Sequence, residues 1–137
     1  MLRRLAGLAR ARADFAFEST LAGRSVRGRI MDLIGFGYDV HVFYLWLPSP
    51  ELAVARVRRR VESGGHNVPE AVTRRRFWKS LVNFDRLYRP IATTWRVYDG
   101  GALGGRALIA HGAGMGEPSV LDHTNWSEMR RRIEEDA

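Results

Sequence analysis

Two groups of polar residues have the types and spacing to bind a phosphorylated substrate. The first lies in segment 17–25, where a carboxylate, several hydroxyls, a glycine and an arginine occur close together. Glu18 and Thr20 could hydrogen-bond a polar substrate, and Arg24 could grip its phosphate as a bidentate fork. The alternative is an ordinary polar loop in which Ser25 caps the following helix.

The second group is a pair of arginine-rich helices joined by a glycine loop. Arg56 and Arg60 precede Gly64 and Gly65, whereas His66 and the cluster 74–76 follow them. Two arginine clusters hinged on glycine could close over phosphates and stabilise a transferring phosphoryl group. The alternative is that each cluster is only a solvated helix face. His66 shares no metal-type spacing with a second histidine or a carboxylate, so no metal site is predicted.

Composition narrows the classes of protein that remain. The chain has 137 residues and a net charge of +7, and its 22 basic residues include a single lysine, Lys79. This excess of basic over acidic residues favours a polyanionic partner. The alternative is that a GC-rich genome alone produces the abundance of arginine. The chain has no cysteine, which excludes disulfides, thiolate zinc sites and a cysteine nucleophile. The longest apolar run, 42–47, is far below the roughly 18 residues of a membrane span. We therefore expect one soluble, cytoplasmic domain that makes no contact with a membrane.

The hydrophobic pattern predicts alternating helices and strands. The run 40–47 is almost continuously apolar, which is typical of a strand buried on both faces. Pro48 ends it, and Ser49 followed by Pro50 predicts the start of a helix. The other expected helices are at 2–12, from Ser25, from 67 to a bend or an end near Pro90, and at 126–135. Strands are expected at 15–17, 95–98 and 107–111, and the last two would form a hairpin. This order predicts an α/β fold with parallel central strands, helices on both faces and a C-terminal antiparallel hairpin.

Several segments together resemble one family. They are FAFESTLAGRS at 15–25, GYDVH at 37–41, YLWLPSPELA at 44–53, GGHNVP at 64–69 with the arginines 74–76, and WRVYD at 95–99. This set is similar to the zeta-toxin-like P-loop kinases, also described as predicted ABC-type ATPases. The similarity covers 12–112 as a core, followed by a loop and helix at 113–137.

The resemblance implies a three-layer P-loop NTPase fold with a mostly parallel sheet, use of ATP and Mg²⁺, and phosphoryl transfer. Toxin members of that family phosphorylate UDP-activated amino sugars. By resemblance, Glu18 and Thr20 bind the substrate, with Arg24 in the same loop. Arg56 and Arg60 match the catalytic arginines of the lid, and His66 and Arg75 belong to its nucleotide-facing part.

A phosphate-binding loop is missing from the sequence. Such a loop needs Gly, four residues and then Gly-Lys-Ser/Thr, because backbone N–H groups and the lysine cradle the phosphates. Lys79 and Ser80 are the right pair, but Thr73 and Trp78 occupy the glycine positions. The first strand–helix unit would thus lie upstream of Met1. We expect a single partial domain over 1–137 that is inactive alone and is marginally stable or oligomeric, because its strand edges are unpaired.

Two kinds of function remain open. The first is the C-terminal part of an ATP-dependent small-molecule kinase, whose partners would be a nucleotide, a substrate and either an antitoxin or a second copy joined at the sheet edge. The second is a non-catalytic basic module that binds nucleotide or nucleic acid. Phe77, Phe84 and Tyr88 follow the core stripe of their helix, which argues against a stacking surface for nucleic acid.

Overall fold

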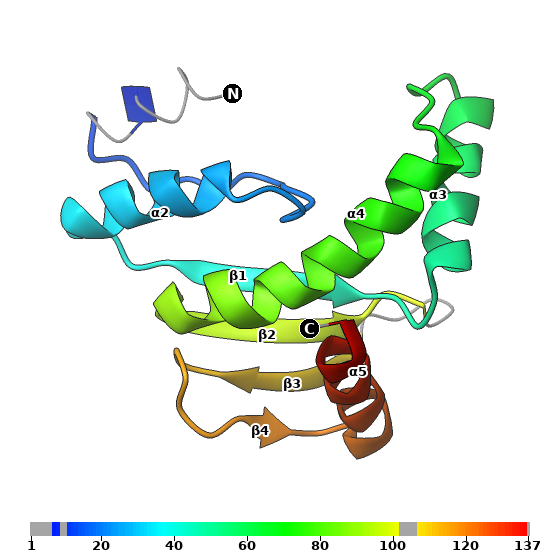
Figure 1. The fold of residues 1–137 in the computed structure, drawn as a ribbon. Coiled ribbons are helices and arrows are strands. Elements are labelled where there is room, and N and C mark those ends of the chain that lie inside the picture. Colours follow the sequence, from blue (N-terminus) through cyan, green and yellow to red (C-terminus); the bar gives the residue numbers. More distant parts are fainter. Residues whose placement is uncertain (1–6, 9–10, 102–106, 137) are drawn as a thin grey trace.

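The computed structural model describes residues 7–8, 11–101 and 107–136, and Figure 1 shows their arrangement. Helices and strands alternate in the first half, and a small antiparallel region with a final helix forms the second. The elements are α2 (Ser25–Gly35), β1 (His41–Trp46), α3 (Pro50–Glu62), α4 (Glu70–Asn83), β2 (Thr94–Asp99), β3 (Leu108–Gly112), β4 (Ser119–Val120) and α5 (His123–Asp136).

The sheet is mixed, and the expectation of a mostly parallel P-loop sheet is wrong. Its order is β1-β2-β3-β4, in which β1 and β2 are parallel while β2–β3 and β3–β4 are antiparallel. Parallel neighbours need a long crossover connection, and α3 and α4 supply one between β1 and β2. Only short loops follow β2 and β3, so the later strands turn back on their neighbours. The α/β class and the C-terminal hairpin are confirmed.

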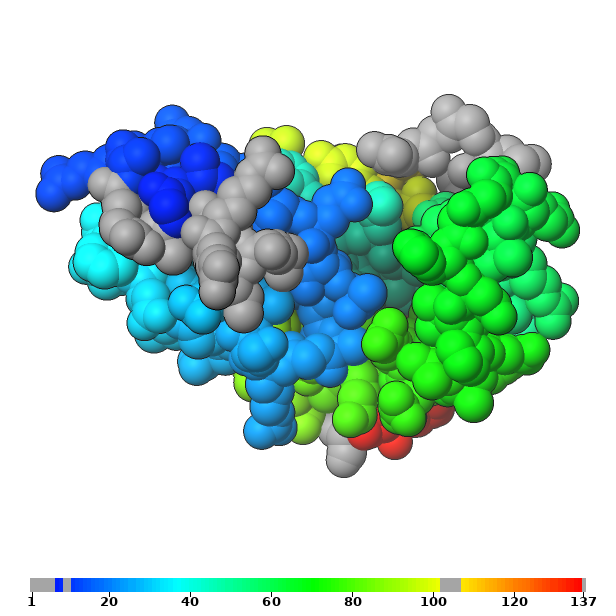
Figure 2. Space-filling model, turned by 90° about the horizontal axis from the view of Figure 1, so that it is seen from above, coloured from blue at the N-terminus to red at the C-terminus, as the bar shows by residue number. Residues whose placement is uncertain are grey.

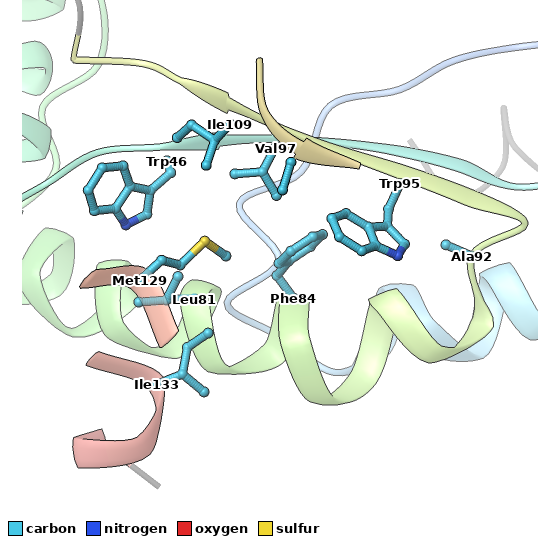
Figure 3. Packing of buried hydrophobic residues seen from close by; sticks show 10 residues of the cluster. Trp46, Leu81, Phe84, Ala92, Trp95, Val97, Ile109, Met129 and Ile133 are labelled. Atoms are coloured by element: carbon cyan, nitrogen blue, oxygen red, sulfur yellow. The ribbon is translucent and has the colours of Figure 1, made fainter. Parts of the chain in front are cut away.

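One hydrophobic core lies between the sheet and the helices α4 and α5 (Figure 3). The strands contribute Trp46, Val97 and Ile109, all nearly inaccessible to solvent. Leu81 of α4 and Met129 of α5 meet them from the helix side. Because the helices that build this core lie on one face of the sheet, the expected three-layer arrangement is not observed in the described residues.

Strand β1 is buried on one face only, which corrects the expectation that both faces are buried. On the inner face Tyr44 stacks on Phe84 with ring centroids 4.5 Å apart. Its hydroxyl lies 3.3 Å from Ser80 Oγ, and burial raises the pKa of Tyr44 to about 12. On the outer face Phe43 and Leu45 are 63% and 44% exposed. An unbroken apolar run does not distinguish a doubly buried strand from one with an uncovered apolar face.

Helix α3 begins and ends where the sequence predicts. Ser49 has an extended backbone immediately before Pro50, the first residue of the helix. Proline suits this position because its missing N–H would have no partner within the helix. Gly64, with φ of +92°, lies just beyond the end of the helix and turns the chain towards α4. Ser25 differs from its expected role, because α2 already includes it and Arg24 occupies the N-cap.

Helix α4 changes its winding before the chain enters β2. It continues into a π-helical turn at Phe84–Tyr88 and a 3-10 turn at Arg89–Ile91, so the helical segment ends near Pro90, as expected. A π-helical turn accommodates one extra residue in the helix, and such turns occur frequently at functional sites.

A cluster of charged and aromatic side chains holds α5 against this turn. Asp85 accepts a hydrogen bond of 2.7 Å from Arg89 and another from Arg130 of α5. The guanidinium group of Arg89 lies 5.0 Å from the ring centroid of Trp95. Trp95 in turn stacks on Trp126 of α5, with their ring centroids 5.7 Å apart. The cluster therefore joins a strand, the π-helical turn and the C-terminal helix.

The segment before α2 pairs with no strand of the described sheet, so the strand expected at 15–17 is not formed. Its side chains pack on the chain that leads into β1 instead. Phe15 meets the edge of Tyr38 at 5.7 Å, and the Tyr38 hydroxyl donates to the carbonyl of Ala13 at 2.9 Å. The helix expected at 2–12 lies largely outside the described residues.

Candidate functional site

The carboxyl ends of the two parallel strands meet beside α3. The backbone N–H of Gly100, just after β2, donates to the carbonyl of Trp46 at the end of β1 at 2.8 Å. Arg56 of α3 donates to the carbonyl of the same glycine. The guanidinium group is thus held over the end of the sheet where α/β proteins commonly bind their ligands.

The arginines near the α3–α4 loop fall into two kinds. Arg74 pairs with Glu51 at 2.8 Å and with Glu70 at 2.9 Å, and Arg58 pairs with Glu70 at 3.3 Å. The hydrogen bond from Arg74 lowers the pKa of Glu51, and the bonds to both glutamates raise the pKa of Arg74. These arginines are neutralised and hold the two helices together.

The second kind comprises the remaining predicted lid residues, which are not paired with carboxylates among the described residues. Arg60, His66 and Arg75 are exposed, and in the described part of the chain they form no ion pair. Arg60 follows Arg56 by four residues, so both lie on the same side of α3. The backbone N–H of Gly65 returns to the Arg60 carbonyl at 2.7 Å, which sets the tight turn after the helix.

The segment with Glu18, Thr20 and Arg24 is anchored by its backbone. Asn83 donates to the carbonyl of Leu21 at 2.8 Å, and the hydroxyl of Tyr88 donates to the carbonyl of Gly23 at 2.7 Å. Leu21 has a positive φ of 57°, which produces a sharp turn between these two anchors.

The fixed backbone leaves the polar side chains of this segment in solvent. Glu18, Thr20 and Arg24 are all exposed. The hydroxyl of Thr20 accepts only a long bond of 3.4 Å from the N–H of Ala22, so it retains capacity for a further partner. The three residues follow an unpaired segment and not the end of a paired strand, which differs from the expected strand-end position.

The two groups of residues flank a hollow in the surface. Figure 2 shows it between the blue N-terminal segment and the green helices α3 and α4, with the cyan-to-teal chain that contains β1 lying deeper between them. Within residues 11–101 and 107–136, no ion pair or side-chain hydrogen bond joins Glu18, Thr20 or Arg24 to the arginines of α3 and α4. Segment 17–25 and the helices α3 and α4 thus lie on opposite sides of this hollow.

The described residues do not fit ATP with Mg²⁺. Lys79 lies within α4, where its backbone N–H belongs to the helix, and residues 73–78 are helical instead of forming a glycine-rich loop. Among the described residues no group of three or more histidine, aspartate or glutamate side chains could hold a metal ion. The nucleotide site that the resemblance implies is not formed by this part of the chain.

The aromatic residues of α4 and the π-helical turn contribute to packing. Phe84 and Tyr88 are fully buried. Phe77 meets the edge of Trp78 at a centroid distance of 4.8 Å. A stacking surface for bases needs exposed ring faces, and the buried rings of Phe84 and Tyr88 do not provide them.

Sequence reasoning missed the Asp85 cluster. Asp85 and Arg89 are four residues apart, and this spacing is the signal that could have revealed their pairing on a helix. Arg130 joins them from a distance of 45 residues along the chain, and no local pattern reports such a contact.

Comparison with known proteins finds a relative over part of the chain. It is an uncharacterized protein of Haemophilus influenzae, 36% identical over 63 residues, and the match covers 46% of this chain and 45% of that protein. The matched part is therefore less than half the length of the relative. No known family profile matches the sequence. No solved structure matches the chain. None of the described helices is long and apolar enough to cross a lipid bilayer.

Proposed function

We propose that this chain is the acceptor-binding and lid part of a zeta-toxin-like small-molecule kinase, and that it binds a phosphorylated acceptor such as a UDP-amino sugar. The observation that carries the proposal is the position of Arg56. It lies over the carboxyl ends of the parallel strands β1 and β2 and contacts no carboxylate within the described residues. An arginine held there by a backbone carbonyl keeps donors free for phosphate oxygens.

The α3–α4 pair would bind the phosphates of the acceptor. Arg56 and Arg60 share one side of α3 and would contact them first. His66 follows the glycine turn directly and Arg75 lies on α4, and both would contact the acceptor from that side. The ion pairs of Arg74 keep the two helices in fixed relation, so the free arginines would move together.

The N-terminal segment would orient the rest of the acceptor. Glu18 could accept a hydrogen bond from a sugar hydroxyl, and Thr20 could either donate or accept one. Arg24 would add a further positive charge on this side of the hollow. The anchors at Asn83 and Tyr88 fix this segment before the acceptor arrives, which lowers the entropic cost of binding.

Complete phosphoryl transfer requires a nucleotide site from outside the described residues. A further segment or a partner chain carrying a Gly-Lys-Ser/Thr loop would supply ATP and Mg²⁺. The described residues bind and position the acceptor, and every role assigned above concerns that acceptor alone.

Calorimetric titration tests acceptor binding, with UDP-N-acetylglucosamine and with pyrophosphate as probes. We expect Arg56→Ala to weaken binding of both probes about tenfold, because a charge-assisted bond to phosphate is lost. Arg58→Ala is the matched control on the same helix. Arg58 is exposed but paired with Glu70, so we expect less than a twofold change.

Three outcomes of the titration would count against acceptor binding. The first is the absence of binding by the wild-type chain. The second is an equal loss of affinity in Arg56→Ala and Arg58→Ala. The third is that UDP-N-acetylglucosamine binds no more tightly than pyrophosphate. The last outcome would favour a general anion site, such as a basic nucleotide-binding module would have.

The kinase part of the proposal has its own test. The intact mass of the native protein from its source cells would show whether further peptides with a Gly-Lys-Ser/Thr loop belong to it. We expect such peptides, and we expect phosphoryl transfer to the acceptor only when they are present. A native product that has the mass of this chain and shows no phosphoryl transfer with any co-purified protein would contradict the kinase part. The chain would then bind its ligand without catalysis.

A further inference from the structure

The outer face of the sheet carries an exposed apolar surface. Phe43 of β1 and Tyr98 of β2 stack there with ring centroids 6.4 Å apart, and Leu45 lies next to them in the same strand. Phe43 is 63% exposed and Leu45 is 44% exposed, so nothing in the described residues covers them. Figure 1 shows α4 and α5 together on the other side of the strands. Exposed apolar patches bordered by polar groups commonly mark interaction sites.

The outward positions of the same strands include an arginine and no carboxylate. Strand register places Phe43 beside Arg96, Arg96 beside His111, and His111 beside Ser119, which forms one row across the sheet. The neighbouring rows are His41 with Thr94 and Leu45 with Tyr98 and Leu108, so no outward position of the described strands is a carboxylate. Arg96 is exposed and has no ion pair among the residues that the structure describes.

We propose that this outer sheet face binds an acidic amphipathic helix of a partner protein. Sheet faces in α/β proteins are covered by helices, whereas added strands bind at sheet edges. The six residues of β1 span about 20 Å, the length of a helix of about 13 residues. An apolar stripe on that helix would cover Phe43, Leu45 and Tyr98, and flanking carboxylates would meet Arg96.

Charge makes a second copy of this chain a poor occupant of the face. The chain has a net charge of +7, and two such faces in contact would each present Arg96 to the other without a carboxylate to pair with it. An acidic helix would be attracted to the same surface, because its carboxylates can pair with Arg96.

Amide shift mapping by NMR on the full chain tests the proposal with two synthetic helical peptides. Both peptides have the same leucine stripe, and their flanking positions are all Glu in one and all Lys in the other. We expect the Glu peptide to shift the amides of β1 and β2 and to bind at least tenfold more tightly than the Lys peptide. Raising the salt concentration should reduce that difference, because the discrimination is electrostatic.

Variants of exposed residues assign the binding to this face. Phe43→Ser should weaken the Glu peptide about tenfold, as the loss of a central aromatic contact does at protein interfaces. Met115→Ser is the matched control, because Met115 is 64% exposed in the loop between β3 and β4 and not on these strands. It should leave the affinity unchanged. Arg96→Glu should reverse the preference in favour of the Lys peptide.

Each contrary outcome overturns the proposal. Equal affinity for the two peptides would show apolar adhesion without recognition of charge. Shifts confined to α4 and α5, or no shifts at all, would remove the outer face as the site. A dimer in sedimentation velocity that Phe43→Ser dissolves would identify a second copy as the occupant.

Discussion

Asp85 is a largely buried carboxylate that pairs with two arginines. Its side chain is about nine-tenths buried, and two guanidinium groups donate to the same carboxylate oxygen. Arg89 is equally buried, and its Nε atom has no hydrogen-bond partner within the described residues. The charge of Arg89 is therefore compensated by Asp85 and by the ring faces of Trp95 and Trp126.

We expect Asp85→Asn to lower the free energy of unfolding by about 3 kcal/mol, because it leaves a buried arginine without a counter-charge. Urea unfolding followed by tryptophan fluorescence measures this loss. The control is Glu135→Gln, which removes a carboxylate from an exposed pair with Arg131 and should cost less than about 1 kcal/mol. Equal losses in the two variants would show that the Asp85 cluster adds nothing beyond a surface pair.

Glu128 gives α5 a pH-dependent contribution to stability. Hydrogen bonds from Arg131, and then from Arg132, lower the pKa of Glu128 from 4.5 to about 2. A lowered pKa in the folded state stabilises the protein above pH 4.5, and this contribution disappears as the pH falls towards 2. The gap in unfolding free energy between the wild type and Glu128→Gln should therefore be present at pH 7 and should close near pH 2. A carboxyl titration by NMR with a midpoint above pH 4 would contradict this.

At the scale of elements, two glycines should respond in opposite ways to alanine. A Cβ at Gly65 would lie 2.9 Å from the carbonyl oxygen of Arg60, a backbone atom that cannot easily move away. Gly28 lies within α2, and a Cβ there would meet nothing within 4 Å. We expect Gly65→Ala to lower the unfolding free energy by about 1 to 2 kcal/mol, and Gly28→Ala to raise it by about 0.5 to 1 kcal/mol. Thermal unfolding followed by circular dichroism measures both, and a stabilising Gly65→Ala would refute the tight turn after α3.

The elements that were predicted well have strong local signals. Ser49 with Pro50 marked the start of α3, Gly64 marked its end, and the strand runs 95–98 and 107–111 marked the hairpin of β2 and β3. The strand expected at 15–17 failed because pairing depends on a neighbour, and β1 pairs with β2 alone in the described sheet. The residue types of a segment indicate its β propensity, but they do not indicate whether a second strand lies beside it.

The candidate site was predictable in its parts and not in its arrangement. The arginines and the Glu18–Arg24 segment were recognised from residue type and spacing. Which arginines are neutralised was not, because Glu51 and Glu70 reach Arg74 from two different helices. The placement of Arg56 over the strand ends depends on Gly100, which is 44 residues away.

At the scale of the whole molecule, α5 closes the core. Ile133 and Met129 are almost inaccessible to solvent between the sheet and α4. We expect Ile133→Ala to lower the unfolding free energy by about 3 kcal/mol through the cavity it leaves. Leu121→Ala, at a position that is 59% exposed, should change it by less than about 0.5 kcal/mol.

The same experiment tests whether the chain unfolds as one unit. Tryptophan fluorescence and far-ultraviolet circular dichroism should give coincident transitions, because α5 and the sheet share one core. An early fluorescence transition, with the helical signal retained, would show that α5 detaches separately.

The π-helical turn at Phe84–Tyr88 determines the direction in which the side chains after it point. One residue more or less in a helix rotates the later side chains by about 100°. Shortening this turn by one residue would swing the Tyr88 hydroxyl away from the Gly23 carbonyl and Arg89 away from Trp95, although every contact partner would still be present. Insertions and deletions should therefore be excluded from this turn, where the length of the chain determines which way its side chains point.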